Sequence, residues 1–245
     1  MEKFFVANWK MNGSIKLVRE AILHYSNDVI TNNSNVILSI PSIYLFYASN
    51  LIKESNSKIK LCAQDISTYD KSGPYTGEVS ANMLQEFDVK YCIIGHSERR
   101  TLFNEVDSIL LSKLENTIKN NMIPIFCIGE PLKLRQNDKY IEFLIAQLEL
   151  LTLIKLEISH IIIAYEPIWS IGTGLIPTVE EIENISNLIN AFVQNNLKYG
   201  KIYTLYGGSV TQENCKSIID SPFLNGVLVG SASLKPKEFT NICNY

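Results

Sequence analysis

Short apolar runs alternate along the chain with longer segments that mix apolar and polar residues. The apolar runs number eight and lie at residues 4–7, 36–40, 59–63, 89–94, 123–128, 161–165, 202–206 and 227–229. Several intervening segments carry apolar residues at helical spacing, as do Ile15, Val18, Ile22 and Tyr25. The pattern therefore predicts eight strands that alternate with helices.

The composition of the runs indicates how these strands are arranged. They are almost continuously apolar, which is typical of parallel strands buried on both faces by crossover helices. Eight such units in 245 residues match the size of a (β/α)8 TIM barrel. No linker interrupts the chain, so we expect residues 1–245 to form a single domain. An open, doubly wound sheet is the alternative, but the even number of runs favours closure.

Overall composition excludes several classes of protein. Hydrophobic residues make up 46% of the chain and charged residues 19%, as in ordinary globular proteins. A net charge of −3 provides no basic field for nucleic acid. No apolar stretch approaches the roughly 18 residues of a membrane span. Charges at Glu2 and Lys3 and again at Lys10 leave no room for the apolar core of a secretory signal. We therefore expect a cytoplasmic protein without nucleic-acid or membrane partners.

The five cysteines are odd in number, widely spaced and mostly placed in apolar runs. That distribution predicts reduced core residues rather than a disulfide framework. No spacing typical of metal ligands is present, so we expect neither a metal nor a cofactor.

Polar residues follow three of the predicted strands. Asn8 and Lys10 follow the first, His96 the fourth and Glu166 the sixth. In a barrel of parallel strands these ends meet at one rim, where active sites lie. Strand alternation aims Asn8 and Lys10 to the same side. A cation, an imidazole and a carboxylate are therefore expected to converge.

Glycine-rich segments follow the last strands, where such barrels bind phosphate through backbone N–H groups. The segments are Gly172-Thr173-Gly174 after the sixth run, Gly207-Gly208-Ser209 after the seventh, and Gly230-Ser231 after the eighth. We expect glycine here for two reasons: a side chain would keep the amides from the phosphate oxygens, and tight anion nests require positive φ.

Taken together, these segments resemble the triosephosphate isomerase family from end to end. The matching segments occur in family order: ANWKMNG at 7–13, AQD at 63–65, YTGE at 75–78, IGHSERR at 94–100, CIGE at 127–130, AYEPIW at 164–169, IGTG at 171–174, YGGSV at 206–210 and ASLKP at 232–236. The resemblance implies interconversion of D-glyceraldehyde 3-phosphate and dihydroxyacetone phosphate through an enediolate. Such an activity belongs to glycolysis, gluconeogenesis and the pentose phosphate shunt.

The resemblance also implies a role for each site residue. Glu166 is the base, and His96 polarises the carbonyl. In this family the histidine acts as a neutral imidazole because a helix N-terminus lowers its pKa, a property for which the family is itself the standard example. Lys10 supplies positive charge, Asn8 donates a hydrogen bond, and Glu98 holds Lys10 in place. The residues expected to bind substrate are Asn8, Lys10, Gly172, Ser209, Gly230 and Ser231.

Residues 167–178 resemble the family's lid, which keeps water from the intermediate. The expected lid residues are Pro167, Ile168, Trp169, Gly172, Thr173 and Gly174, with Trp169 anchoring the leading end. The trailing end departs from the family at Leu175-Ile176-Pro177. Because Pro177 fixes its own φ and restricts Ile176, we expect altered lid kinetics. Two further departures are Ser170 for alanine and Ser231 for glycine.

Thr178 with Glu181 three residues later predicts a capping box at the start of the helix that follows the sixth run.

The stretch 68–80 is long for a loop between a strand and a helix, and loops of that length are usually functional. In the family it is an arm that docks into a second subunit. Thr76 is the residue expected to reach Asn8 across that interface, and the resemblance therefore implies a homodimer.

Two other functions remain open on the sequence alone. The first is a barrel aldolase that forms a Schiff base on Lys10 with a phosphorylated sugar, which borohydride trapping would detect. The second is a catalytically silent phosphate-binding homologue. Retention of Lys10, His96 and Glu166 argues against the silent homologue, and carboxylate with histidine suits proton transfer next to a carbonyl better than an imine.

Overall fold

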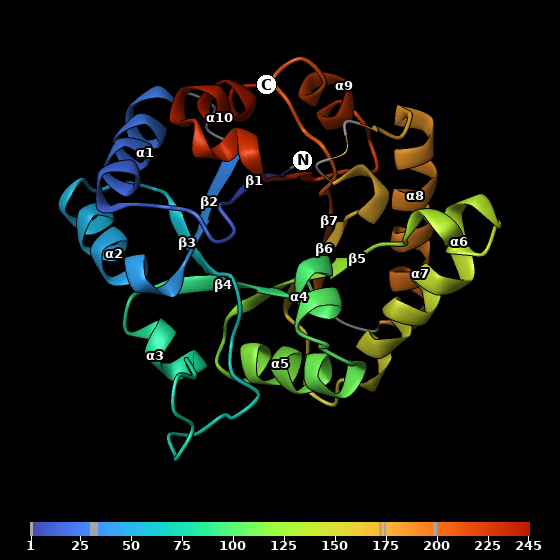
Figure 1. Cartoon of the computed structure of the whole chain (residues 1–245), viewed down its shortest axis with the longest axis horizontal. Coiled ribbons are helices and arrows are strands. Elements are labelled where there is room, and N and C mark those ends of the chain that lie inside the picture. Colours follow the sequence, from blue (N-terminus) through green and yellow to red (C-terminus); the bar gives the residue numbers. More distant parts are fainter. Residues whose placement is uncertain (1, 30–33, 172, 174, 198–199) are drawn as a thin grey trace.

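The computed structural model describes residues 2–29, 34–171, 173, 175–197 and 200–245. Its eight parallel strands form a closed barrel in chain order, and the helices surround it (Figure 1). Closure comes from pairing of the first strand with the last, Phe4 opposite Gly226. The predicted TIM barrel is thus confirmed, and the open sheet is wrong.

The strands are β1 Lys3–Asn8, β2 Ser34–Ile40, β3 Lys60–Ala63, β4 Val89–Ile94, β5 Ile123–Ile128, β6 His160–Tyr165, β7 Lys201–Tyr206 and β8 Gly226–Val229.

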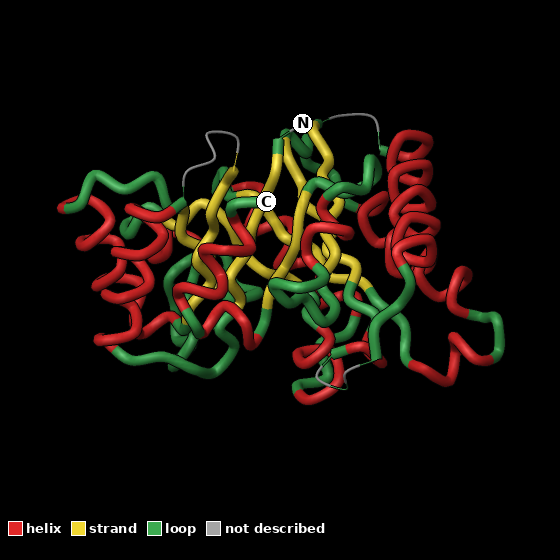
Figure 2. Tube along the Cα trace, turned by 90° about the horizontal axis from the view of Figure 1, so that it is seen from above, coloured by secondary structure: helices red, strands yellow, loops and turns green. Residues whose placement is uncertain are grey.

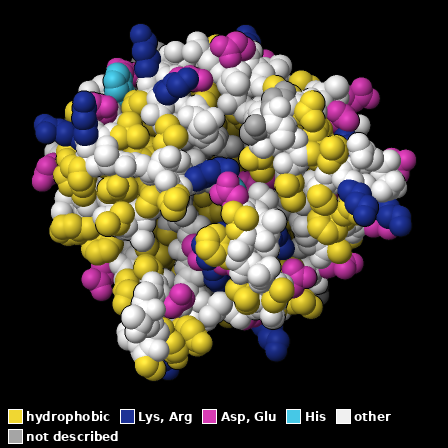
Figure 3. Space-filling view, in the orientation of Figure 1, with side chains coloured by type: hydrophobic (Ala, Val, Ile, Leu, Met, Phe, Trp, Pro, Cys, Tyr) yellow, Lys and Arg dark blue, Asp and Glu magenta, His cyan; other side chains and the backbone are white. Residues whose placement is uncertain are grey.

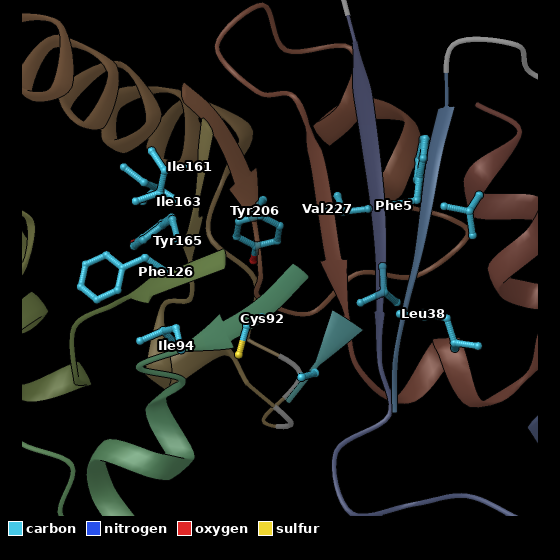
Figure 4. Close-up of a cluster of buried hydrophobic side chains, with 14 of the residues drawn as sticks. Phe5, Leu38, Cys92, Ile94, Phe126, Ile161, Ile163, Tyr165, Tyr206 and Val227 are labelled. Atoms are coloured by element: carbon cyan, nitrogen blue, oxygen red, sulfur yellow. The ribbon is translucent and has the colours of Figure 1, made fainter. Parts of the chain in front are cut away.

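Each predicted apolar run coincides with a strand to within two residues, because both faces of the barrel wall are buried. Alternate side chains point to opposite faces. Along β1, Val6 belongs to the cluster inside the barrel, whereas Phe5 and Ala7 belong to the outer layer beneath the helices. Figure 4 shows this outer layer, with Tyr165 and Tyr206 among the side chains that project from the wall.

The helices surround the strands (Figure 1), and in the view turned by 90° they flank the strands (Figure 2). They are α1 Ile15–Asp28, α2 Leu45–Glu54, α3 Ala81–Gln85, α4 Ser97–Leu102, α5 Asp107–Lys119, α6 Leu132–Gln136, α7 Tyr140–Glu149, α8 Val179–Asn196, α9 Cys215–Ile219 and α10 Pro236–Cys243, with short 3-10 turns η1 Ser42–Tyr44, η2 Leu150–Leu153, η3 Ile168–Ser170 and η4 Ser231–Leu234. On α1, Val18, Ile22 and Tyr25 are buried as expected, but Ile15 is half exposed because it occupies the first turn.

One glycine is required for the barrel to close. Gly226 has φ 142, in the region that side chains rarely adopt, and a Cβ there would lie 1.9 Å from the carbonyl oxygen of Phe4 on β1. Strands β8 and β1 can approach this closely only because residue 226 has no side chain.

The predicted arm is the connection between β3 and α3, and it projects from one side of the barrel between α3 and α5 (Figure 1). The rings of Tyr69 and Tyr75 stack within it at 3.6 Å between centroids. Its base is held by α5, since Asn116 Nδ2 donates to the carbonyl of Thr68 at 2.9 Å and Lys119 pairs with Asp70 at 2.5 Å. The arm is therefore a structured projection.

All five cysteines are buried, as predicted. Within the described parts of the chain, none of the helices has the length and apolar character needed to cross a membrane.

Candidate active site

A cavity of about 360 Å³ opens at the carboxyl ends of the strands. Near the centre of this face, basic and acidic side chains lie together (Figure 3). The cavity brings together residues that the sequence predicted from five different strand ends, namely Asn8, Lys10, His96, Glu166, Ser209, Gly230 and Ser231. Gly172 lies outside the described residues, and so does Gly174.

Lys10 reaches the cavity through an unusual backbone. Strand β1 ends at Asn8, and Lys10 has φ 53, so a left-handed turn rather than strand alternation directs its side chain. Its N–H donates to Asn8 Oδ1 at 3.1 Å, and its Nζ lies 2.5 Å from Glu98 Oε1. A strained residue of this kind persists only where its surroundings hold it, which is typical of functional sites.

Gln64 is part of that support and was given no role in the sequence analysis. Its Nε2 donates to the carbonyl of Lys10 at 2.9 Å and to that of Ser39 at 3.2 Å. The available signal was a glutamine directly after the third apolar run. Lys10, whose carbonyl accepts from Gln64, lies 54 residues earlier in the chain. The contact is therefore visible only in the folded barrel, where the ends of β1 and β3 lie close together.

His96 is oriented by the start of α4. It is the N-cap of this helix, and its Nδ1 accepts the backbone N–H of Glu98 at 3.2 Å. A ring nitrogen that accepts a hydrogen bond carries no proton, so a neutral ring has its proton on Nε2. His96 Nε2 lies 3.2 Å from Glu166 Oε1 and points into the cavity as a donor.

Glu166 directly follows β6 and is almost completely buried. Burial raises the pKa of its carboxyl group above the ordinary value of 4.5, while His96, the backbone N–H of Ser97 and Lys10 act in the opposite direction. The Ser97 N–H lies 3.4 Å from Oε2. The site thus holds a carboxylate with raised proton affinity beside an imidazole donor, an arrangement suited to moving protons between carbon and oxygen.

The loops after β7 and β8 form the other wall, and they correct one expectation. Gly230 has φ −84, so it needs no positive φ. Ser231 begins the 3-10 turn η4, a conformation that any residue adopts, so serine is accommodated there. At position 207, glycine is required because the backbone of the β7 loop lies against the Glu166 side chain, and a Cβ there would lie 2.8 Å from Glu166 Cγ.

Comparison with known proteins agrees with this geometry. A sequence model of the triosephosphate isomerase family matches residues 3–245. Triosephosphate isomerase from Thermodesulfovibrio yellowstonii is 44% identical over 100% of this chain and 99% of its own length. The enzyme from Orientia tsutsugamushi strain Ikeda is 40% identical over 99% of this chain and 97% of its own length. The chain belongs to the triosephosphate isomerase family.

The leading end of the predicted lid segment is held by Glu130, a residue to which the sequence pattern assigned no role. Glu130 is completely buried, and its Oε1 accepts Trp169 Nε1 at 2.8 Å and the Tyr165 hydroxyl at 3.1 Å. Arg135 lies 3.8 Å from the same oxygen. The available signal was a glutamate two residues after the fifth apolar run, because a charge buried at such a place needs a partner.

The trailing end of the lid segment is held by the same arginine. Arg135 Nη2 lies 2.7 Å from Glu181 Oε1, and Glu181 Oε2 accepts the backbone N–H of Thr178 at 2.8 Å. The Thr178 hydroxyl accepts the Glu181 N–H in return, which confirms the predicted capping box. Both ends of the segment are therefore linked to α6.

Among the other predicted lid residues that the structure describes, Pro167 is buried, Ile168 is half-buried and Thr173 is exposed. Ile168 and Trp169 lie in η3 after Pro167, and Thr173 Oγ1 donates to the Trp169 carbonyl at 2.7 Å. Ile176 lines the cavity, and Pro177 is buried next to the start of α8. Thr76 is exposed on the arm. Among the described residues, no group of three or more His, Cys, Asp or Glu side chains is placed to hold a metal ion.

Proposed function

We propose that this chain is an aldose–ketose isomerase that interconverts D-glyceraldehyde 3-phosphate and dihydroxyacetone phosphate. The observation that carries the proposal is the buried Glu166 carboxylate, 3.2 Å from His96 Nε2, in a cavity that also contains Lys10 and the loops after β7 and β8. Proton transfer between adjacent carbons of a carbonyl compound requires one base and one donor to the oxygen, and the cavity supplies both.

In the proposed reaction, Glu166 removes the proton from the carbon next to the carbonyl. Its burial raises the proton affinity of the carboxylate and so makes it a stronger base than an exposed glutamate. The same carboxyl group then returns the proton to the neighbouring carbon, while the hydroxyl proton of the substrate passes to the former carbonyl oxygen through His96 Nε2, which lines the cavity. One residue therefore serves both directions without a cofactor or metal.

His96 and Lys10 stabilise the negative charge that develops on the substrate oxygens. The Nε2–H of His96 faces the cavity because Nδ1 is engaged by α4. Lys10 is kept in position by Glu98, and Asn8 supports the Lys10 backbone. Donors that are oriented before the substrate arrives stabilise an enediolate without reorganisation.

The amide groups of Ser209, Gly230 and Ser231, together with Gly172, are proposed to hold the phosphate. Residues 167–178 are proposed to cover it as a lid, with Pro167, Ile168, Trp169, Gly172, Thr173 and Gly174 as its leading half. Anchoring of Trp169 by Glu130 supports a segment that pivots about this end.

A coupled assay of triose phosphate interconversion tests the proposal. Glu166→Asp retracts the carboxylate by one methylene, and we expect kcat to fall by about 10²–10⁴-fold with little change in KM. The exposed Glu157 provides a matched control, since Glu157→Asp should leave both constants unchanged. Absence of turnover in the wild type, or full activity in Glu166→Asp, would reject the assignment.

Neither alternative function is favoured by a specific contact. Lys10 Nζ is paired with Glu98 at 2.5 Å, which suits a charged ammonium rather than the free amine that a Schiff base requires. Borohydride treatment with dihydroxyacetone phosphate should therefore leave the protein mass unchanged. A silent homologue would show no turnover in the coupled assay.

We also propose that residues 1–245 act as one domain in a cytoplasmic homodimer serving glycolysis, gluconeogenesis and the pentose phosphate shunt. Support for the dimer comes from exposed apolar side chains around the arm. Met11, Ile43, Phe46 and Leu102 are all exposed, and they follow β1, β2 and β4. Strands β2 and β4 are the neighbours of β3, from which the arm starts. Hydrophobic side chains gather over the region of α2 and near the arm (Figure 3). A patch of this kind is typical of a subunit interface.

A further inference from the structure

Ser170 joins the lid segment to the loop that follows β7. It is the last residue of η3, four positions after Glu166, and it is completely buried. Ser209 Oγ donates to the Ser170 carbonyl at 2.6 Å, and the Ser209 N–H donates to Ser170 Oγ at 3.4 Å. Both polar hydrogens of Ser209 are thus directed at Ser170.

The surrounding packing leaves the Ser170 hydroxyl little freedom to move away. Its oxygen lies 3.4 Å from the Tyr206 hydroxyl. A Cβ on Gly208 would lie 2.1 Å from the Tyr206 hydroxyl and 3.0 Å from Ser170 Oγ, so the β7 loop is pressed against this pair of hydroxyls. Burial raises the pKa of Tyr206 to about 12, so its hydroxyl remains protonated at neutral pH and can donate or accept.

The Ser209 N–H is also one of the groups proposed to bind the phosphate, and a single N–H cannot give a full hydrogen bond to two acceptors. We propose that Ser170 is a positioning residue whose hydroxyl competes with the substrate phosphate for the Ser209 amide, so that phosphate binding breaks this one of the two hydrogen bonds between the η3 segment and the β7 loop. The inference rests on the proposed function, because it takes the cavity's anion to be the phosphate of the substrate.

Ser170 is connected to the proposed catalytic base by a single short turn. The Ser170 N–H donates to the Pro167 carbonyl at 2.8 Å, which makes residues 167–170 one turn. This turn directly follows Glu166, and a Cβ on Gly207 would lie 2.8 Å from Glu166 Cγ. Part of the binding free energy of the phosphate, a remote and unreactive group, is thus used to reposition the segment beside the base.

The test is inhibition by inorganic phosphate in wild type and Ser170→Ala. Removing the competing hydroxyl should lower the inhibition constant of phosphate about two- to tenfold, the equivalent of one lost hydrogen bond. General damage to the fold would instead weaken phosphate binding. Ser186 is a matched control, since it is equally buried but bonds only to the Ile182 carbonyl on α8, and Ser186→Ala should leave the inhibition constant unchanged.

Ser170→Cys provides a second variant with a weaker acceptor at the same place, and its inhibition constant should fall between those of wild type and Ser170→Ala. An unchanged or raised constant in both variants would overturn the inference. Phosphate binding measured by calorimetry needs no turnover and separates the two proposals. If phosphate binds more tightly to Ser170→Ala than to a wild type that does not isomerise triose phosphates, the proposed function is wrong but the competition stands.

Discussion

Glu166 is a carboxylate held where water hardly reaches, and its ionisation links activity to pH. As the proposed base, Glu166 must be ionised to accept a proton, and burial raises its pKa above 4.5. We therefore expect kcat/KM to fall on the acid side through an apparent pKa above 4.5, measured as a pH–rate profile of the free enzyme. An apparent pKa at or below 4.5 on the acid side of the profile would contradict the effect of burial.

The same shift in pKa affects stability. A carboxyl group whose pKa is higher in the folded than in the unfolded chain stabilises the fold while protonated, and this contribution is lost as the pH rises through the folded-state value. Gln cannot ionise. Glu166→Gln should therefore unfold at a higher Tm than wild type at neutral pH, and the difference should shrink as the pH falls toward 4.5. A constant difference across this range would show that ionisation is not its cause.

At the scale of single elements, the trailing end of the lid segment combines a buried proline with a helix cap. Pro177 restricts the backbone just before α8, so Pro177→Ala gives this end more conformations. Ordering the freer backbone when the lid closes should cost roughly 0.4–1 kcal/mol of conformational entropy, so we expect kcat to fall about two- to fivefold. Pro222 is exposed and distant in the chain, and Pro222→Ala should keep the wild-type kcat. Equal rates in wild type and Pro177→Ala would refute a role of this residue in the lid.

The cap itself can be tested separately from its ion pair. Thr178→Ala removes the hydroxyl that accepts the Glu181 N–H and should lower the free energy of unfolding by about 1 kcal/mol in urea denaturation. Glu181→Gln keeps an oxygen for the capping box but loses the ion pair with Arg135. Because Glu181 is partly exposed, Glu181→Gln should lower the free energy of unfolding by only about 0–1 kcal/mol. A larger loss in Glu181→Gln than in Thr178→Ala would reverse this ranking.

At the scale of the whole molecule, the proposed dimer buries the apolar side chains beside the arm. Ile43 is 80% exposed and lies outside the catalytic cavity. A charge there should prevent association, so Ile43→Asp should sediment as a monomer and lose activity, since Thr76 could then no longer reach Asn8 of a second copy. Leu153 is also exposed, at 56%, and follows α7. Leu153→Asp should remain dimeric, and a monomeric wild type would remove the proposal altogether.

Periodicity along the chain was sufficient to predict the eight strands, because the hydrophobic pattern that defines a strand buried on both faces is local. The strand ends with Lys10, His96 and Glu166 were equally visible, since each residue lies within three positions of the end of its run. The helical spacing that includes Ile15 correctly indicated a helix, but it does not reveal where the first turn emerges into solvent, and Ile15 is half exposed.

The roles of Gln64, Glu130 and Ser170 required the folded barrel. Gln64 acts on a carbonyl 54 residues away, and Ser170 contacts a loop 39 residues further on. Such contacts depend on the register and closure of neighbouring strands, which no local pattern encodes. Local patterning thus specified the elements and the chemistry at their ends. The direction of Lys10, the close approach at Gly207 and the engagement of Ser209 arose only when eight strand ends were brought to one rim, because these are steric and hydrogen-bonding relations between segments far apart in the chain.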